Sequence, residues 1–301
     1  MVLGFLKINF VILELLQIKK MKKTISIIVL TLLIYSCNQN TSSIDFTKEG
    51  GFTDGIEGPA TDSEGNIYAV NFQEQGTIGK TTPNGKSSLF IKLPNGSIGN
   101  GIRFGNTNQM FVADYTNHNI LEIDLVTKKI EIFANQPNAN QPNDIAISPN
   151  NTLYASDPNW SDNTGKLWKI TKEKGFELLE EKMGTTNGIE VSNDGKKLYV
   201  NESIQRKIWV YDIVEGGSIT NKQEFISFED FGLDGMRFNR NGNLFVCRYE
   251  KGTIAVISPK GKLLNEIKLI GKKPTNITFS PDYKKCYITI ADRGCIEVVK
   301  L

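Results

Sequence analysis

The sequence of 301 residues contains one histidine, and this scarcity excludes several classes of site. Zinc centres built from several imidazoles, and mechanisms that need a histidine pair, cannot be assembled from it. None of the four cysteines forms a Cys-x-x-Cys pair, so a zinc ribbon and a thioredoxin-like motif are also excluded. Lysine and arginine total 35 against 33 acidic residues, with no basic block to bind a run of phosphates. We therefore expect no nucleic-acid partner.

Residues 1–37 are predicted to be an export signal. Lys22 and Lys23 precede the apolar run 25–35, which is the pattern of a secretory signal. Residues 34–37 resemble a bacterial lipobox, in which the cysteine is acylated, so Cys37 is the predicted site of lipidation. An ordinary signal peptide cut nearby and an uncleaved anchor are the alternatives. The lipobox predicts an exported bacterial lipoprotein on the periplasmic face of a membrane, attached to that membrane only through its lipid.

Two further segments near the N-terminus are expected to lie outside the fold. Residues 1–20 form a second apolar stretch, interrupted by Lys7 and Glu14, which we interpret as an over-extended start site. A membrane-anchoring helix is the alternative. Residues 38–43 are polar and small, which is typical of a flexible tether.

One motif recurs six times in the remaining chain. Each copy begins with a polar residue, which is usually followed by glycine and then by an apolar residue, a turn and a strand containing an aromatic residue. Successive copies are 43, 43, 44, 47 and 42 residues apart, and the aromatic follows after 11 residues, or 12 in the fourth copy. The first residues of the copies are Glu57, Asn100, Asn143, Asn187, Asp234 and Asn276, and the aromatics are Tyr68, Phe111, Tyr154, Tyr199, Phe245 and Tyr287.

Each repeat contains four short runs that alternate between apolar and polar residues, which predicts four antiparallel strands. In the second repeat they span 101–104, 110–113, 120–124 and 130–133. A four-stranded repeat of this length is one propeller blade, so residues 44–301 are predicted to form an all-β, six-bladed β-propeller. The last repeat has room for three strands, and we expect the segment 44–48 to supply the fourth and close the ring.

The repeat also predicts a ring of oxygen ligands. The first residue of each copy enters the innermost strand, so the six side chains should converge at one mouth of the central channel. All six carry a carboxylate or an amide, and two carboxylates supplemented by amide oxygens suit Ca²⁺. The alternative is that these residues only cap loops, as Asn and Asp often do.

Several of these motifs, in this order and spacing, resemble the senescence marker protein/gluconolactonase/luciferin-regenerating-enzyme family. They are Glu57-Gly58-Pro59, Gln141-Pro142-Asn143-Asp144, the segment 154–158, Asn187-Gly188 and Asp234-Gly235-Met236. The resemblance covers residues 50–301 and departs from animal members at Gln141-Pro142, where they carry an arginine. It implies a six-bladed propeller that hydrolyses a lactone or related ester with one divalent cation, usually Ca²⁺, with Mg²⁺, Mn²⁺ and Zn²⁺ as alternatives.

Carried over by position, the resemblance implies that Glu57, Asn187 and Asp234 are metal ligands and that Asn143 is a ligand or a substrate contact. Asp234 is also the candidate catalytic residue, either as general base or as nucleophile. The ends of the second strands should face the same mouth. Together with the motif residues, they give the predicted substrate-binding residues Asn100, Asp144, Asp157, Trp160, Tyr115 and Arg248. The loop from Asp157 to about Trp168 is the predicted lid, and Phe72, Tyr115 and Trp160 could form an apolar wall or simply pack the blades.

The sequence thus predicts a monomeric, calcium-dependent lactonase-type hydrolase acting on a small-molecule lactone or ester. The alternative is a non-enzymatic propeller that binds a glycan or protein in the same mouth, with a structural metal. Cys247, Cys286 and Cys295 fall on strands of the last two blades, where they are expected to be buried free thiols, with one disulfide among them as the alternative.

Overall fold

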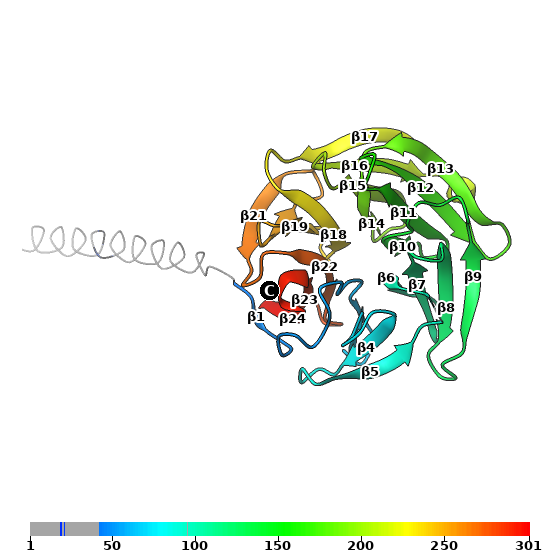
Figure 1. The fold of residues 1–301 in the computed structure, drawn as a ribbon. Coiled ribbons are helices and arrows are strands. Elements are labelled where there is room, and N and C mark those ends of the chain that lie inside the picture. The colour runs from blue at the N-terminus through cyan, green and yellow to red at the C-terminus, as the bar shows by residue number, and fades with distance from the viewer. Residues whose placement is uncertain (1–18, 20, 22–41, 95) are drawn as a thin grey trace, which may run out of the picture. The chain divides into compact units, whose positions relative to one another are not determined.

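The computed structural model describes residues 19, 21, 42–94 and 96–301. The signal segment, Cys37 and residues 38–41 of the tether lie outside the described residues. The chain from residue 42 onward forms six four-stranded antiparallel sheets arranged as blades around a central channel (Figure 1). The prediction of an all-β, six-bladed propeller is therefore confirmed.

Five blades are meanders whose four strands run outward from the channel in chain order, because short turns connect consecutive strands, and the sixth has the N-terminal strand as its outermost member. Besides the strands, the described residues contain two 3-10 turns, η1 (Glu215–Gly217) and η2 (Ala291–Arg293). No helix among the described residues is long and apolar enough to cross a membrane. The strands are β1 Ile44–Asp45, β2 Ala60–Thr61, β3 Ile67–Val70, β4 Thr77–Thr81, β5 Ser87–Lys92, β6 Gly99–Phe104, β7 Gln109–Asp114, β8 Asn119–Asp124, β9 Ile130–Asn135, β10 Ile145–Ile147, β11 Leu153–Asn159, β12 Thr164–Thr171, β13 Gly175–Met183, β14 Thr186–Val191, β15 Lys197–Glu202, β16 Lys207–Ile213, β17 Ile219–Ser227, β18 Gly232–Phe238, β19 Leu244–Tyr249, β20 Thr253–Ile257, β21 Leu263–Lys268, β22 Pro274–Phe279, β23 Lys285–Ile290 and β24 Cys295–Lys300.

The N-terminal strand closes the ring. Strand β1 pairs antiparallel with β24, so the sixth sheet has the order β1-β24-β23-β22, and Figure 1 shows the two ends of the propeller side by side. This pairing confirms the predicted closure and leaves β24 without a free edge. The tether is shorter than predicted, because Ser43 is buried and its hydroxyl donates to the Glu297 carboxylate.

The hydrophobic core consists of six clusters, one between each pair of neighbouring blades. The six recurring aromatics are all buried in these clusters, and most meet an aromatic ring edge to face. The three cysteines among the described residues are free and buried, as expected. Since each blade buries its faces only against its neighbours, the ring must close for the first and last blades to be covered.

The innermost strands carry an irregularity where they enter the channel. The pairing register of β6, β14, β18 and β22 with the next strand shifts at this point. Such bulges turn side chains away from their regular positions, here toward the channel.

The register corrects one member of the predicted ring. Tyr287 pairs with Thr278 in the sixth blade, and Phe111 pairs with Arg103 in the second, so Thr278 and Arg103 occupy equivalent positions. Asn100 lies three residues before Arg103, and Thr275 lies three residues before Thr278. Thr275, and not Asn276, is therefore the counterpart of Asn100. The β22–β23 hairpin is one residue longer than the β6–β7 hairpin, and this insertion offset the sequence alignment.

Candidate active site

A pocket of about 270 Å³ opens at one mouth of the central channel. It combines two acids, two amides, one serine and two aromatic residues. Its lining residues are Glu57, Asn143, Trp160, Asn187, Ser203, Asp234 and Tyr249. The structure thus brings together all four predicted metal ligands, together with Trp160.

Glu57 and Asp234 are held in the same way although they lie in different blades. Glu57 accepts a hydrogen bond from the backbone N–H of Gly58 at 2.7 Å, and Asp234 accepts one from Gly235 at 3.0 Å. The Asn201 side chain donates to the backbone carbonyl of Asp234 at 2.6 Å and fixes the chain there. Each carboxylate is therefore oriented by the glycine that follows it, and most of its oxygen lone pairs remain available to a ligand.

Burial raises the pKa of both carboxyl groups. For Glu57 the pKa rises to about 7, first because the group is desolvated and then because the Asp144 carboxylate lies nearby. For Asp234 it rises well above the usual range, through desolvation and then the charges of Glu57 and Asp144. Neither acid has a cationic partner that fully compensates its charge, which is the environment that a bound cation would complete.

The two asparagines supply neutral oxygens. Asn143 Oδ1 is buried and has no hydrogen-bond partner among the described residues. The side chain of Asn187 is close enough to Asp234 to lower the pKa of that acid. Asn100 is buried, and its Nδ2 donates to the backbone carbonyl of Asn143 at 3.1 Å, so it supports Asn143 and is not among the pocket's lining residues. An unpaired, buried amide oxygen is costly unless something coordinates it.

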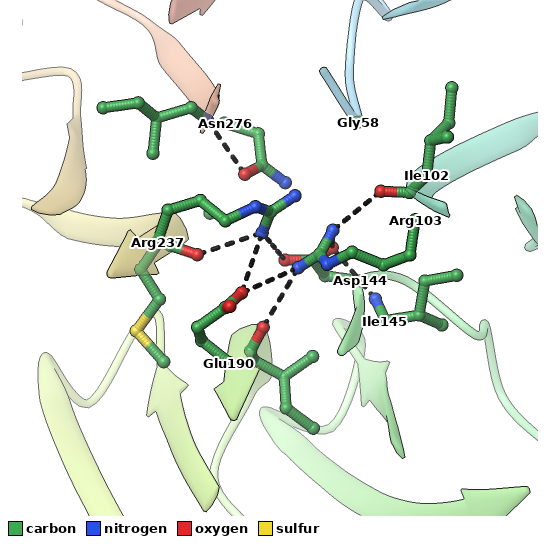
Figure 2. A network of polar contacts seen from close by, with 12 residues as sticks. Gly58, Ile102, Arg103, Asp144, Ile145, Glu190, Arg237 and Asn276 are labelled. Atoms are coloured by element: carbon green, nitrogen blue, oxygen red, sulfur yellow. Dashed lines mark hydrogen bonds and ion pairs between the residues drawn. The ribbon is translucent and has the colours of Figure 1, made fainter. Parts of the chain in front are cut away.

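A second layer of charged groups lies deeper in the channel (Figure 2). Arg103 donates to Asp144 and to Glu190, both at 3.2 Å, and Arg237 reaches the same Glu190 oxygen at 3.2 Å. Asp144 is 1% exposed, and its Oδ1 also accepts the Ile145 N–H. The prediction that Asp144 contacts substrate does not fit this geometry, because its carboxylate belongs to the buried ion network.

The buried charges of the channel favour a divalent cation. Among the described residues of the channel, Glu57, Asp234 and Asp144 are buried and Glu190 is partly buried. These four acids exceed the guanidiniums of Arg103 and Arg237 by two negative charges when all are ionised. Uncompensated buried charge is expensive, and one divalent ion would neutralise it. Carboxylate and amide oxygens are the ligands of hard cations, so the residues present fit Ca²⁺ or Mg²⁺ better than a thiophilic metal.

The predicted lid is absent, and Asp157 has a different role. Most of the segment from Asp157 to Trp168 is strand, since β11 runs to Asn159 and β12 starts at Thr164. The Asp157 carboxylate is fully buried and accepts from the Trp168 indole N–H at 2.8 Å and from the backbone N–H groups of Asn140 and Gln141. It anchors the loop that carries Asn143 and does not face the pocket.

Other predicted contacts also lie outside the pocket lining. Arg248 is buried against Asp230 at 2.7 Å and Glu266 at 2.9 Å, with its guanidinium 3.9 Å from the Phe228 ring centre. Tyr115 does not line the pocket, and Phe72 packs against Phe52.

Tyr249 and Ser203 line the pocket instead, and neither was among the predicted site residues. The alternation of side chains along β19 could have identified Tyr249, because neighbouring residues on a strand face opposite sides.

Comparison with known proteins finds relatives that match most of the chain. The chain is 28% identical over 246 residues to the gluconolactonase of Zymomonas mobilis, covering 70% of this chain and 68% of that protein. It is 27% identical over 284 residues to the diisopropyl-fluorophosphatase of Loligo vulgaris, covering 83% and 90%.

Solved structures share the fold. A luciferin-regenerating enzyme superposes with a TM-score of 0.73 at 23% identity, covering 83% of this chain and 92% of that one. Regucalcin of Agrobacterium tumefaciens, described as a calcium-binding protein, gives 0.75 at 17% identity, covering 86% and 94%. The profile described as SMP-30/Gluconolactonase/LRE-like region matches residues 56–292. The chain therefore belongs to the SMP-30/gluconolactonase/LRE-like family.

Proposed function

We propose that this protein is a divalent-cation-dependent hydrolase of lactones or related esters, with Ca²⁺ as the first candidate cation. The observation that carries this proposal is the convergence of two buried carboxylates, Glu57 and Asp234, with the amides of Asn143 and Asn187 on one pocket wall. Relatives named gluconolactonase and diisopropyl-fluorophosphatase support hydrolysis, and a structural neighbour described as calcium-binding supports the choice of ion.

The four residues Glu57, Asn143, Asn187 and Asp234 would hold the cation. A cation bound there would supply Lewis-acid polarisation of the substrate carbonyl and stabilise developing negative charge on its oxygen. Asp234 would accept a proton from the attacking water, or attack the carbonyl carbon itself. Asn201 holds the backbone of Asp234 in place, and Trp160 with Tyr249 presents ring surface to the substrate. The position of the carboxylate thus depends on contacts already built into the fold.

None of the described residues that line the pocket is a lysine or an arginine. A substrate bearing a phosphate or sulfonate would therefore meet two carboxylates without a compensating positive side chain. We propose that neutral lactones are the preferred substrates.

The test is a panel of neutral lactones, a phosphorylated lactone and a phosphotriester, with hydrolysis followed by proton release in the presence of Ca²⁺ or a chelator. Cation-dependent turnover that is fastest on neutral lactones supports the proposal. Cation binding without turnover on any member would favour the non-enzymatic alternative.

Cation affinity should depend on pH. Glu57 and Asp234 must lose protons before they bind a cation, and the pKa of Glu57 is about 7 in the cation-free protein. Raising the pH from about 5 to about 8 should therefore increase Ca²⁺ affinity. Calorimetry in two buffers with different ionisation enthalpies should also reveal proton release near pH 6. Affinity that is constant across this range, without proton release, would contradict the assignment.

The raised pKa values of the same acids also determine how the stability of the cation-free protein changes with pH. A folded-state pKa above the unfolded value means that the cation-free folded protein holds a proton which the unfolded chain has already lost. Its free energy of unfolding should therefore fall as pH rises from about 4.5 to about 7, and Ca²⁺ should offset this loss. The Glu57→Gln variant should show a weaker pH dependence in thermal unfolding.

Trp160 is expected to contribute to substrate binding. Its side chain lines the pocket and is 42% exposed, so its ring is accessible to a bound substrate. Trp160→Ala should lower kcat/KM by roughly 3- to 10-fold, mainly through KM. Phe231→Ala is the matched control, because Phe231 is 45% exposed and does not line the pocket. Equal effects of the two substitutions on steady-state kinetics would exclude a specific role for Trp160.

A further inference from the structure

Two of the proposed cation ligands are held by hydrogen bonds that cross from the preceding blade. Asn201, on the second strand of blade 4, donates to the backbone carbonyl of Asp234 in blade 5 at 2.6 Å. Asn100, on the first strand of blade 2, donates to the backbone carbonyl of Asn143 in blade 3 at 3.1 Å. Each bond fixes the main chain at a ligand and leaves the ligand's own side chain free. Glu57 of blade 1 is held in a corresponding way from blade 6.

Thr275 of β22 makes the contact to the Glu57 segment. Its Oγ1 donates to the backbone carbonyl of Ile56, the residue before Glu57, at 2.8 Å. Thr275 is 6% exposed and is not among the residues that line the active-site pocket. The strand register makes Thr275 the counterpart of Asn100, and both side chains donate to a main-chain carbonyl of the following blade. The shared geometry indicates a shared role.

The Thr275 hydroxyl is itself held in one direction. Its oxygen lies 2.7 Å from Oγ1 of Thr289, which is fully buried on β23. Thr289 Oγ1 also accepts the backbone N–H of Asn276 at 3.1 Å, so its own position is fixed by the main chain of β22. A threonine side chain has few allowed rotamers. The donor is therefore already directed at the Ile56 carbonyl before any cation binds.

The bond between Thr275 and Ile56 also joins the two ends of the propeller. The two residues are 219 positions apart in the chain. Blade 6 reaches blade 1 only in the closed ring, which the pairing of β1 with β24 secures. Ile56 is fully buried, so its carbonyl cannot replace this bond with one to bulk water, and losing the donor would be costly.

We propose that Thr275 is a positioning residue that holds Glu57 in place for the cation, so that the candidate active site is complete only in the closed ring. This role rests on the cation site proposed above, and it adds a residue that does not itself line the pocket. Groups that orient metal ligands from outside commonly contribute roughly 10- to 100-fold to metal affinity.

The test compares Ca²⁺ affinity among variants of the full chain by calorimetry. Thr275→Val keeps the shape of the side chain and removes the donor, so Ca²⁺ should bind roughly tenfold or more weakly. Thr275→Ser keeps the hydroxyl and should restore binding to within about twofold of the unmodified chain. If Thr275→Val does not fold, Thr275→Ala replaces it, because Thr275→Ala and Thr275→Ser both lack the methyl group and differ only in the hydroxyl.

The matched control is Thr77→Val in blade 1. Thr77 is 2% exposed, its hydroxyl donates to the backbone carbonyl of Phe72 at 2.7 Å, and it does not line the pocket. The chemical change and the buried bond lost are the same, so any general loss of stability is matched. Thr77→Val should leave Ca²⁺ affinity unchanged.

Amide hydrogen exchange of the cation-free chain gives a readout that does not depend on Ca²⁺. The Gly58 N–H, which donates to Glu57 at 2.7 Å, should exchange faster in Thr275→Val than in the unmodified chain. The Asp144 N–H, which donates to Ser156 Oγ at 3.1 Å in blade 3, should not change. If the unmodified chain bound no Ca²⁺, the proposed cation site would be wrong, and exchange at Gly58 would still decide whether Thr275 positions Glu57.

Three results would each overturn the role of Thr275. They are a Ca²⁺ affinity of Thr275→Val equal to that of the unmodified chain, equal losses of affinity in Thr275→Val and Thr77→Val, and exchange at Gly58 that Thr275→Val does not accelerate.

Discussion

Replacing Asp234 with asparagine is expected to reduce cation-dependent lactone hydrolysis by about 10³-fold or more. The substitution keeps the size of the side chain but removes a negative charge that the proposed cation needs, together with the group that would take the proton from water. Asp234 is buried, and the Gly235 N–H donates to its Oδ1, a hydrogen bond that the Oδ1 of asparagine can also accept. Steady-state kinetics at saturating Ca²⁺ would measure the loss, and calorimetry would show weakened cation binding.

The matched control is Asp162→Asn. Asp162 is an exposed acid in the hairpin that carries Trp160, and it bonds only to neighbouring residues of that turn. The chemical change is identical and lies near the same mouth, but the residue does not line the pocket. Turnover within about twofold of the unmodified protein is expected. A loss in Asp162→Asn similar to that in Asp234→Asn would show that general surface charge, and not coordination, controls the rate.

The two roles open to Asp234 can be separated by isotope labelling. A single turnover in water enriched in ¹⁸O should place the label in the product if water attacks the carbonyl directly. If the carboxylate attacks first, the lactone C–O bond breaks and an acyl-aspartate anhydride forms. Water that then attacks the Asp234 carboxyl carbon would leave ¹⁸O in Asp234 and carry an unlabelled Asp234 oxygen into the product.

The repeat spacing predicted the architecture because each blade forms from consecutive residues and packs against its neighbours in the same way. The turns and the buried aromatic recur at nearly constant distance, so blade number and strand order follow from the sequence. The closing strand at Ile44 was predictable for a related reason, since an unpaired edge in the last blade had to be covered.

The site predictions were wrong where an inserted residue or a register shift of one residue changes the side of the strand that a side chain faces. An extra residue in the β22–β23 hairpin moved Asn276 one step from its expected place, and a constant aromatic spacing cannot reveal such an insertion. Arg248 and Tyr249 are adjacent, yet one pairs with Asp230 and the other lines the pocket. The inward orientation of Arg103, Glu190 and Arg237 follows bulges at the strand entries, and the sequence alone does not locate these bulges.

Gly58→Ala is expected to destabilise the propeller by at least about 3 kcal/mol, and Gly175→Ala by about 1 kcal/mol. Gly58 and Gly175 have positive φ angles, +57° and +65°, so alanine at either position would have a similarly strained backbone. At Gly175 nothing lies within 4 Å of the added Cβ. At Gly58 the Cβ would lie 2.0 Å from the backbone carbonyl oxygen of Asn100 in the next blade. Urea unfolding measures the free energy of unfolding of each variant. Because the backbone strain is similar in both, the difference between these free energies reports the steric clash at Gly58.

The same clash should reach the candidate active site. Gly58 donates its N–H to Glu57, and Asn100 supports Asn143 through its side chain, so separating these two segments displaces two proposed ligands at once. The fraction of Gly58→Ala that still folds should therefore bind Ca²⁺ more weakly than Gly175→Ala does. Similar positions in blades 2, 4 and 5 are also glycine with a close approach to the following blade, at Gly101, Gly188 and Gly235. If Gly58→Ala unfolded no more readily than Gly175→Ala, the blades would not be in rigid contact around the channel, and the ligand positions could not be set by this packing.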